Sequence, residues 1–153
     1  MILVSQSEKD TRRYGRAMAK TLRGGEVLAL QGELGAGKTV FIRGLCQGLK
    51  IKGRVKSPTF NIFNLYHKPF SSSASLIKTV CHLDAYRLKD KKEFLACGAE
   101  EFFNQNQVVC AIEWAEKVKS FLKGHKVILI KFSFGRKAHQ LRLTFPAFFC
   151  KLS

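Results

Sequence analysis

The first third of the chain contains one helical and one strand-like pattern of apolar positions. Residues 7–22 present one face at three- and four-residue intervals, through Tyr14, Ala17, Met18, Thr21 and Leu22, which is the spacing of an amphipathic helix. Ser7, with Asp10 three positions later, predicts the start of this helix, and the glycine pair at 24–25 predicts its end. Residues 27–30 are continuously apolar, which favours a strand buried on both faces.

Three later segments have strand character. Residues 60–66, 79–84 and 108–113 are rich in β-branched, aromatic and other apolar side chains. The last two of these segments each end in an acidic residue. Between them, Asp90 followed by Glu93 forms a capping pattern that predicts a short helix.

The C-terminal region predicts an antiparallel hairpin. Residues 127–134 and 140–145 alternate between apolar and polar positions and flank a turn at 135–139. Strands and helices that alternate in this way over 153 residues predict an α/β fold with a mixed sheet flanked by helices. We expect one domain over residues 1–153, with its core at about 5–145 and a tail at 146–153.

A glycine-rich loop follows directly after the first buried strand. Residues 32–39 read Gly-Glu-Leu-Gly-Ala-Gly-Lys-Thr, a full match to the phosphate-loop pattern G-x-x-x-x-G-K-[ST]. Residues 39–49 then form a helical pattern, so the order is strand, glycine loop, helix. Glycines let the backbone N–H groups turn toward phosphate oxygens, Lys38 supplies a positive charge, and Thr39 supplies a hydroxyl for Mg²⁺.

Two acidic residues are candidates for the metal side of such a site. Asp84 and Glu113 each end a predicted buried strand, where phosphate-loop enzymes place the carboxylate that holds Mg²⁺ or arranges water. The sequence leaves open which of the two contacts the metal. The N-K-x-D motif of guanine-nucleotide proteins does not occur, so a small nucleotide hydrolase is the expectation.

Composition narrows the other possibilities. The formal net charge of +16 suggests either a polyanionic partner or solvated lysines of a basic background, and direct contact with nucleic acid stays open. No apolar run reaches membrane-spanning length and no signal peptide is recognisable, so we expect a cytoplasmic protein without membrane contact.

The cysteines and histidines lack the spacing of a metal site. No two cysteines form a C-x-x-C pair, and the four histidines show no ligand spacing, so we expect no zinc. We expect reduced, buried thiols at Cys46, Cys81, Cys97, Cys110 and Cys150.

Four blocks of the sequence together resemble the TsaE (YjeE) family of bacterial ATPases. They are residues 32–39, 55–60, 82–88 and 112–114, and their order and spacing match the family. The segment 97–103, which combines a glycine with two acids, resembles the family as well. A phosphate loop alone is shared by many families, whereas the set of four blocks is much narrower.

The resemblance covers about residues 5–145 and implies a role in tRNA modification. Proteins of this family are required for threonylcarbamoyladenosine next to the anticodon, and they act with a TsaD–TsaB pair in which TsaD transfers the group. The resemblance implies that this chain hydrolyses ATP with Mg²⁺, slowly alone and faster with its partners, and meets tRNA through the complex.

The resemblance implies roles for five residues. Lys38 and Thr39 bind phosphate and metal, and Thr59 lies in a switch-like loop that senses the γ-phosphate or metal. Asp84 positions water and Glu113 ligates Mg²⁺, although these two roles could be exchanged. The expected nucleotide-binding residues are Glu33, Leu34, Gly35, Ala36, Gly37, Lys38, Thr39, Val40 and Trp114.

Two other classes of protein share parts of this pattern. A small kinase or another P-loop NTPase would carry the same phosphate loop, and would differ by transferring phosphate to an acceptor. A basic RNA-binding module with a vestigial nucleotide site would bind tRNA alone and tolerate loss of Lys38.

Tyr86 and Arg87 are expected to serve structure or partner contact.

Overall fold

One mixed β-sheet organises the part of the chain that the structure describes. The structure is a computed structural model, and it describes residues 1–58, 62–69, 76–135 and 141–145. Within these residues seven strands form one sheet in the order β1-β7-β6-β2-β5-β4-β3. The strands are β1 (Ile2–Ser5), β2 (Glu26–Gln31), β3 (Phe63–His67), β4 (Thr79–Asp84), β5 (Val108–Glu113), β6 (Lys126–Phe134) and β7 (Leu141–Thr144).

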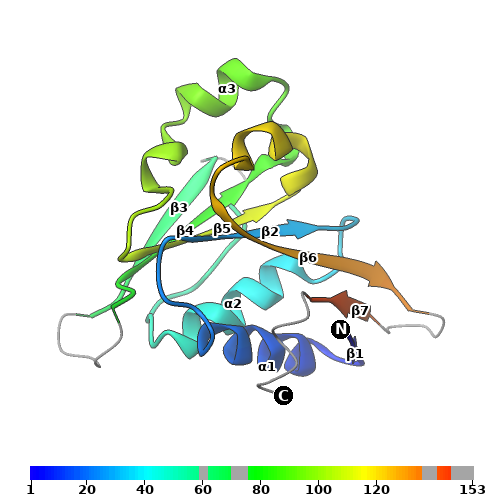
Figure 1. Cartoon of the computed structure of the whole chain (residues 1–153). Coiled ribbons are helices and arrows are strands. Elements are labelled where there is room, and N and C mark those ends of the chain that lie inside the picture. The colour runs from blue at the N-terminus through cyan, green and yellow to red at the C-terminus, as the bar shows by residue number, and fades with distance from the viewer. Residues whose placement is uncertain (59–61, 70–75, 136–140, 146–153) are drawn as a thin grey trace.

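Helices cover both faces of this sheet (Figure 1). One layer contains α1 (Glu8–Ala19) and α2 (Lys38–Gly48). The opposite layer contains α3 (Lys91–Ala96) and the 3-10 segments η2 (Ala99–Phe102) and η3 (Ala115–Leu122), and a further segment, η1 (Ala85–Arg87), follows β4. No helix in the described part of the chain has both the length and the apolar content that crossing a bilayer requires. The predicted α/β class with a mixed sheet is confirmed.

The two faces of β2 explain its continuous apolar sequence. Leu28 and Leu30 belong to the core formed with α1 and α2, whereas Val27 and Ala29 belong to the core on the opposite face. All four side chains are buried, and β2 pairs in parallel with β5 on one side and β6 on the other. A central parallel strand buries both faces, so the four positions in the middle of β2 are all apolar.

The predicted C-terminal hairpin is confirmed in its strands. β6 and β7 pair antiparallel, from Lys131 opposite Thr144 to Phe134 opposite Leu141. The connecting residues 136–140 and the tail from 146 lie outside the described residues.

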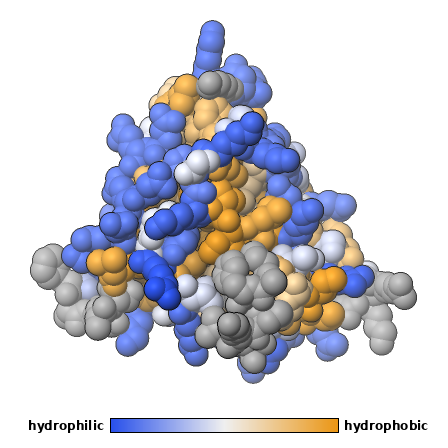
Figure 2. All heavy atoms as spheres, viewed as in Figure 1, coloured by the Kyte–Doolittle hydropathy of each residue, from blue (hydrophilic) through white to orange (hydrophobic). Residues whose placement is uncertain are grey.

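Figure 2 shows one face of the molecule, on which apolar side chains gather near the centre and hydrophilic side chains surround them.

The structure differs from the sequence-based prediction at two element boundaries and in one additional strand. Helix α1 ends at Ala19, well before the predicted glycine pair, because i+3 hydrogen bonds from Lys20 to Ala17 and from Thr21 to Met18 tighten its last turn. Strand β3 begins at Phe63 rather than at 60. Strand β1 was not predicted, and it forms by pairing with β7, a contact between the two ends of the chain.

Ser7 caps α1 as predicted. Its Oγ accepts a hydrogen bond from the Asp10 N–H at 3.2 Å, and it donates to Asp10 Oδ2 at 3.0 Å. Asp10 Oδ2 also accepts from the Gln6 N–H at 3.1 Å. This backbone hydrogen bond, followed by the one from Ser7, holds the pKa of Asp10 below its usual value. The reciprocal bonds set the point at which the chain leaves β1 and enters α1.

The described cysteines are free thiols. Cys46, Cys81 and Cys110 are buried, whereas Cys97 is half-buried. Burial raises the pKa of Cys46 to about 12, so its thiol stays protonated and packs as a small apolar group. Cys150 lies outside the described residues.

Helices α1 and α2 approach each other closely at glycines. A Cβ added to Gly44 would lie 2.2 Å from the carbonyl oxygen of Arg12, and one added to Gly15 would lie 2.2 Å from that of Phe41. Both neighbours are backbone atoms, which cannot swing aside as a side chain can. The spacing of the two helices beneath the sheet therefore depends on the absence of a side chain at these positions.

We expect the Gly44→Ala substitution to lower the free energy of unfolding by about 1–3 kcal/mol, because the added methyl group overpacks the helix contact. The sign is diagnostic, since alanine in place of glycine otherwise stabilises a helix interior by about 1 kcal/mol. Urea unfolding followed by circular dichroism measures the change. The control is Lys9→Ala on the exposed face of α1, expected to change stability by less than about 0.5 kcal/mol. A Gly44→Ala protein as stable as the parent would contradict the close contact.

Candidate functional site

The phosphate-loop pattern forms the connection between β2 and α2. Residues 32–37 lie between the last residue of β2, Gln31, and the first residue of α2, Lys38. Gly37 adopts a left-handed conformation with φ of 80° and is the N-cap of α2. A side chain there would be strained by about 1–2 kcal/mol and would also approach Leu141 to 3.1 Å. The loop thus leads into the N-terminus of α2, where unpaired N–H groups attract anions.

The Lys38 side chain lies across its own loop. It is only 4% exposed, and its Nζ donates to the carbonyl oxygens of Gly32 at 2.6 Å and Glu33 at 2.8 Å. The same Nζ lies 4.1 Å from the centre of the Trp114 ring. Burial lowers the pKa of the Lys38 ammonium group, and nearby carboxylates, first among them Glu113, oppose this shift. A charged group in so little water interacts strongly with any anion that reaches it.

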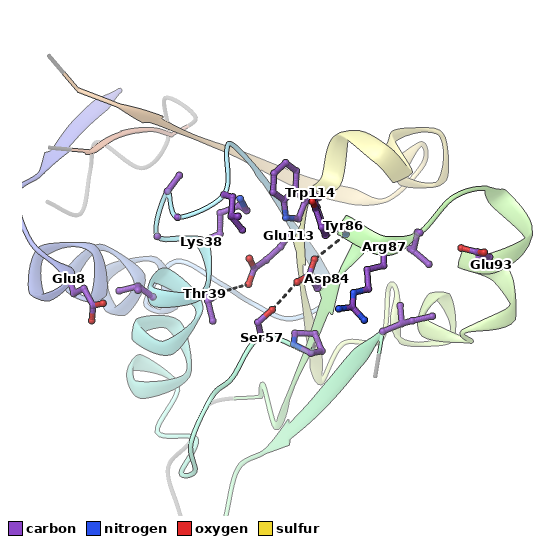
Figure 3. A pocket seen from close by; sticks show the side chains of 18 residues that line it. Glu8, Lys38, Thr39, Ser57, Asp84, Tyr86, Arg87, Glu93, Glu113 and Trp114 are labelled. Carbon is purple, nitrogen blue, oxygen red and sulfur yellow. Dashed lines mark hydrogen bonds between the residues drawn. The ribbon is translucent and has the colours of Figure 1, made fainter. Parts of the chain in front are cut away.

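The two predicted acids lie side by side at the carboxyl ends of neighbouring parallel strands. Asp84 ends β4, Glu113 ends β5, and their Cα atoms are partners in the sheet register. Glu113 is 5% exposed, and its Oε1 accepts a hydrogen bond from Thr39 Oγ1 at 2.7 Å. Figure 3 shows this bond joining the start of α2 to the end of β5. The structure therefore brings Lys38, Thr39, Asp84 and Glu113 into one site.

Asp84 is held by two donors. Ser57 Oγ donates to its Oδ2 at 2.8 Å and the Tyr86 N–H donates to its Oδ1 at 3.0 Å (Figure 3). The bond from Ser57 ties Asp84 to the segment before residue 59. Thr59 itself lies outside the described residues, so its predicted role stays a prediction.

Trp114 adjoins this cluster through an unusual backbone conformation. Its φ of 58° and ψ of 41° are left-handed, which ends β5 and starts η3 directly after Glu113. The indole lies between Lys38 and Tyr86. The centres of the Tyr86 and Trp114 rings are 5.0 Å apart. Left-handed conformations of bulky residues are strained and concentrate at functional sites.

Two residues of the site had no role in the sequence-based prediction. Ser57 bonds Asp84, as described above, and His82 Nε2 lies 2.8 Å from Glu113 Oε1. Both fall within the sequence blocks that suggested the family. Strand alternation places His82 on the same face of β4 as Asp84, but its contact with Glu113 depends on the pairing of β4 with β5.

A cavity of 780 Å³ opens between these groups (Figure 3). Its walls come from the phosphate loop, the 57–58 segment, the ends of β4 and β5, and η1. The predicted nucleotide-binding residues that line it are Leu34, Gly35, Ala36, Gly37, Lys38, Thr39, Val40 and Trp114. Glu33 does not line this cavity, and its contribution is the carbonyl oxygen that Lys38 binds.

A second cavity of 410 Å³ lies on the other side of the phosphate loop. It is bounded by the start of α1 and by the facing ends of β6 and β7, where Phe134 and Leu141 contribute apolar walls. Glu8, Gly35, Gly37 and Val40 line both cavities. An extended ligand on the loop could therefore reach into both cavities.

The oxygen ligands at the site suit a hard cation such as Mg²⁺. They are the hydroxyl of Thr39 and the carboxylates of Asp84 and Glu113. The described residues contain no group of three or more His, Cys, Asp or Glu side chains able to hold a metal by themselves. Mg²⁺ usually takes one or two carboxylates from a protein and completes its shell with phosphate oxygens and water.

Comparisons with known proteins identify the family of this chain. The model of the family described as "Threonylcarbamoyl adenosine biosynthesis protein TsaE" matches residues 5–142. The chain is 40% identical over 129 residues to the tRNA threonylcarbamoyladenosine biosynthesis protein TsaE of Treponema pallidum, a match that spans 84% of this chain and 89% of the relative. It is 34% identical over 122 residues to the protein of the same name from Bacillus subtilis, spanning 80% of this chain and 71% of the relative.

A solved structure shares the fold. The crystal structure of Bacillus subtilis YdiB matches with a TM-score of 0.72 at 26% sequence identity, covering 99% of this chain and 91% of that chain. The family match, the similarity of relatives over most of their length and the phosphate-loop site lead to one conclusion: the chain belongs to the TsaE family and is a P-loop nucleotide-binding protein.

Proposed function

We propose that this protein is an Mg²⁺-dependent ATPase that serves the formation of threonylcarbamoyladenosine in tRNA. The observation that carries the proposal is the hydrogen bond of 2.7 Å between Thr39 and Glu113, which joins the phosphate loop to a strand-end acid in one cavity. The names of the relatives support the process, and the residues that line the cavity support the chemistry. The protein does not itself need a site for the transferred group, because it acts as an accessory to the transfer.

The phosphates bind where the loop meets α2. Lys38 leaves the carbonyl oxygens of Gly32 and Glu33 and turns to the β- and γ-phosphates, which replace those two hydrogen bonds with a charge-assisted contact. The base and ribose extend toward the cavity beside Phe134 and Leu141. This assignment uses both cavities, the one beside the carboxylates for the reacting phosphate and the one beside Phe134 and Leu141 for the base.

Thr39 and Glu113 would hold Mg²⁺, and Asp84 would orient the attacking water. The hydrogen bond between Thr39 and Glu113 favours Glu113 over Asp84 as the metal ligand, since Thr39 and Glu113 meet at the start of α2. The cation supplies charge neutralisation on the transferring phosphoryl group. Asp84 is fixed by Ser57 and by the Tyr86 N–H, so its carboxylate is oriented before the nucleotide arrives. Thr59, two residues beyond Ser57, would respond to the γ-phosphate.

A TsaD–TsaB pair is the proposed partner, and tRNA is met through that complex in the cytoplasm. The nucleotide cavity borders two exposed side chains, Leu34 at 76% and Tyr86 at 51% exposure. A partner that covered this rim would exclude water from the site and strengthen every charge interaction within it. The net charge of +16 suits a complex that handles RNA.

We expect Lys38→Ala to lower the rate of ATP hydrolysis by about 10²-fold or more, because it removes a preorganised charge at the transferring phosphate. Phosphate release under saturating ATP and Mg²⁺ measures the rate, and circular dichroism verifies the fold. The control is Lys119→Ala, which removes an equal charge from an exposed position on η3 and should leave the rate unchanged. A folded Lys38→Ala protein with undiminished phosphate release would refute the assignment.

We expect ATP with Mg²⁺ to change the fluorescence of Trp114. It is the only tryptophan in the chain, and Lys38 Nζ lies 4.1 Å from its ring, so drawing the ammonium group to phosphate alters the charge beside the indole. The titration is compared with calorimetry on the same samples. Saturation by calorimetry without any spectral change would place Trp114 away from the nucleotide.

We expect the isolated chain to release phosphate slowly and a cognate TsaD–TsaB pair to accelerate it. The reason is closure of a cavity that the chain alone leaves open to solvent. Phosphate release is measured for the chain alone, with the pair, and with tRNA only. Stimulation by tRNA without stimulation by the pair would contradict the proposed partnership.

A further inference from the structure

His82 is a fully buried polar side chain that the proposed reaction does not yet use. It has 0% exposure, and it does not line the nucleotide cavity. Its neighbour on β5 in the sheet register is Ala111, whose methyl group leaves room on that face for an imidazole. The ring of Tyr66 lies 6.2 Å away on the β3 side. His82 therefore lies on β4 between the side chains of the two neighbouring strands, next to Glu113 at the end of β5.

The contact of His82 with Glu113 is specific to one oxygen. His82 Nε2 lies 2.8 Å from Glu113 Oε1, and the same oxygen accepts the 2.7 Å bond from Thr39 Oγ1. Two donors thus converge on Oε1. Among the described residues no group donates to the second oxygen, Oε2, which belongs to a side chain that lines the cavity.

The hydrogen-bond pattern places a proton on one ring nitrogen of His82. An ionised carboxylate only accepts hydrogen bonds, so the proton of the imidazole lies on Nε2. Within the described residues Nδ1 has no hydrogen-bond partner. His82 therefore serves Glu113 as a donor through its Nε2–H.

We propose that His82 is a positioning residue, which holds Glu113 Oε1 so that Oε2 is presented to the divalent cation of the bound nucleotide. This inference rests on the proposed function. Thr39 is itself a proposed metal ligand, so the cation would also determine where its hydroxyl lies. His82 is the donor to Glu113 whose position does not depend on the cation. Groups in this position behind a metal ligand change metal affinity by about 10- to 100-fold.

Two substitutions separate the hydrogen bond from the volume of the ring. His82→Leu removes the donor and keeps an apolar group of similar size. His82→Gln keeps an N–H donor at a distance along the side chain close to that of Nε2. The Mg²⁺ concentration for half-maximal binding of ATP is measured by calorimetry, beside the affinity for ADP in EDTA, which requires no metal.

His82→Leu should raise the half-maximal Mg²⁺ concentration by about 10- to 100-fold, leave ADP affinity in EDTA unchanged, and be largely rescued in His82→Gln. An unchanged Mg²⁺ requirement in His82→Leu, or equal losses in the Leu and Gln variants, would overturn the inference. If the parent protein itself shows no Mg²⁺-dependent binding of ATP, the proposed function fails instead.

The parent protein supplies a readout that does not depend on the stability of the variants. Nitrogen-15 NMR of the histidine rings should show a proton on Nε2 of His82. In Glu113→Gln the Nε2–H signal should shift, because its acceptor changes from a carboxylate to an amide. An Nε2 without a proton, or a signal unmoved by Glu113→Gln, would overturn the inference even if His82→Leu did not fold.

Discussion

The parallel pairing of β4, β5 and β2 is the constraint on which the site depends. Parallel neighbours deliver their carboxyl ends to the same edge of a sheet, and ligands of open α/β sheets bind outside that edge. The register sets Asp84 beside Glu113 and Glu113 beside Leu30, the residue one position before the end of β2. A shift of one residue in either pairing would turn the carboxylates to the opposite face, away from α2.

The same site also holds two charged side chains that are almost entirely shielded from water. Lys38 and Glu113 are both buried, at 4% and 5% exposure, and buried charges require partners. Lys38 finds two carbonyl oxygens and an aromatic face, and Glu113 finds Thr39 and His82. Each buried charge thus has partners among the described residues, as burial requires.

The N-terminal segment and the C-terminal hairpin support the site from the other side of the loop. β1 pairs with β7, and Ser5 Oγ bonds Thr11 Oγ1 at 2.7 Å inside α1. Thr11 and Leu141 then pack beside Gly37. Distant parts of the chain therefore meet at the start of α2, and the close approach of α1 to α2 holds this meeting point against the sheet.

Local sequence patterns determined the elements and the chemistry, whereas the tertiary structure decided the contacts. The apolar run at 27–30, the phosphate loop and the acids at 84 and 113 follow from local spacing, because a doubly buried strand and a phosphate loop impose it on consecutive residues. Strand β1, the bond of Thr39 to Glu113 rather than to Asp84, and the place of His82 behind Glu113 could not be predicted in this way. They depend on strand order and register, which arise from packing between residues far apart in the chain, for example 39 with 113 and 2 with 144.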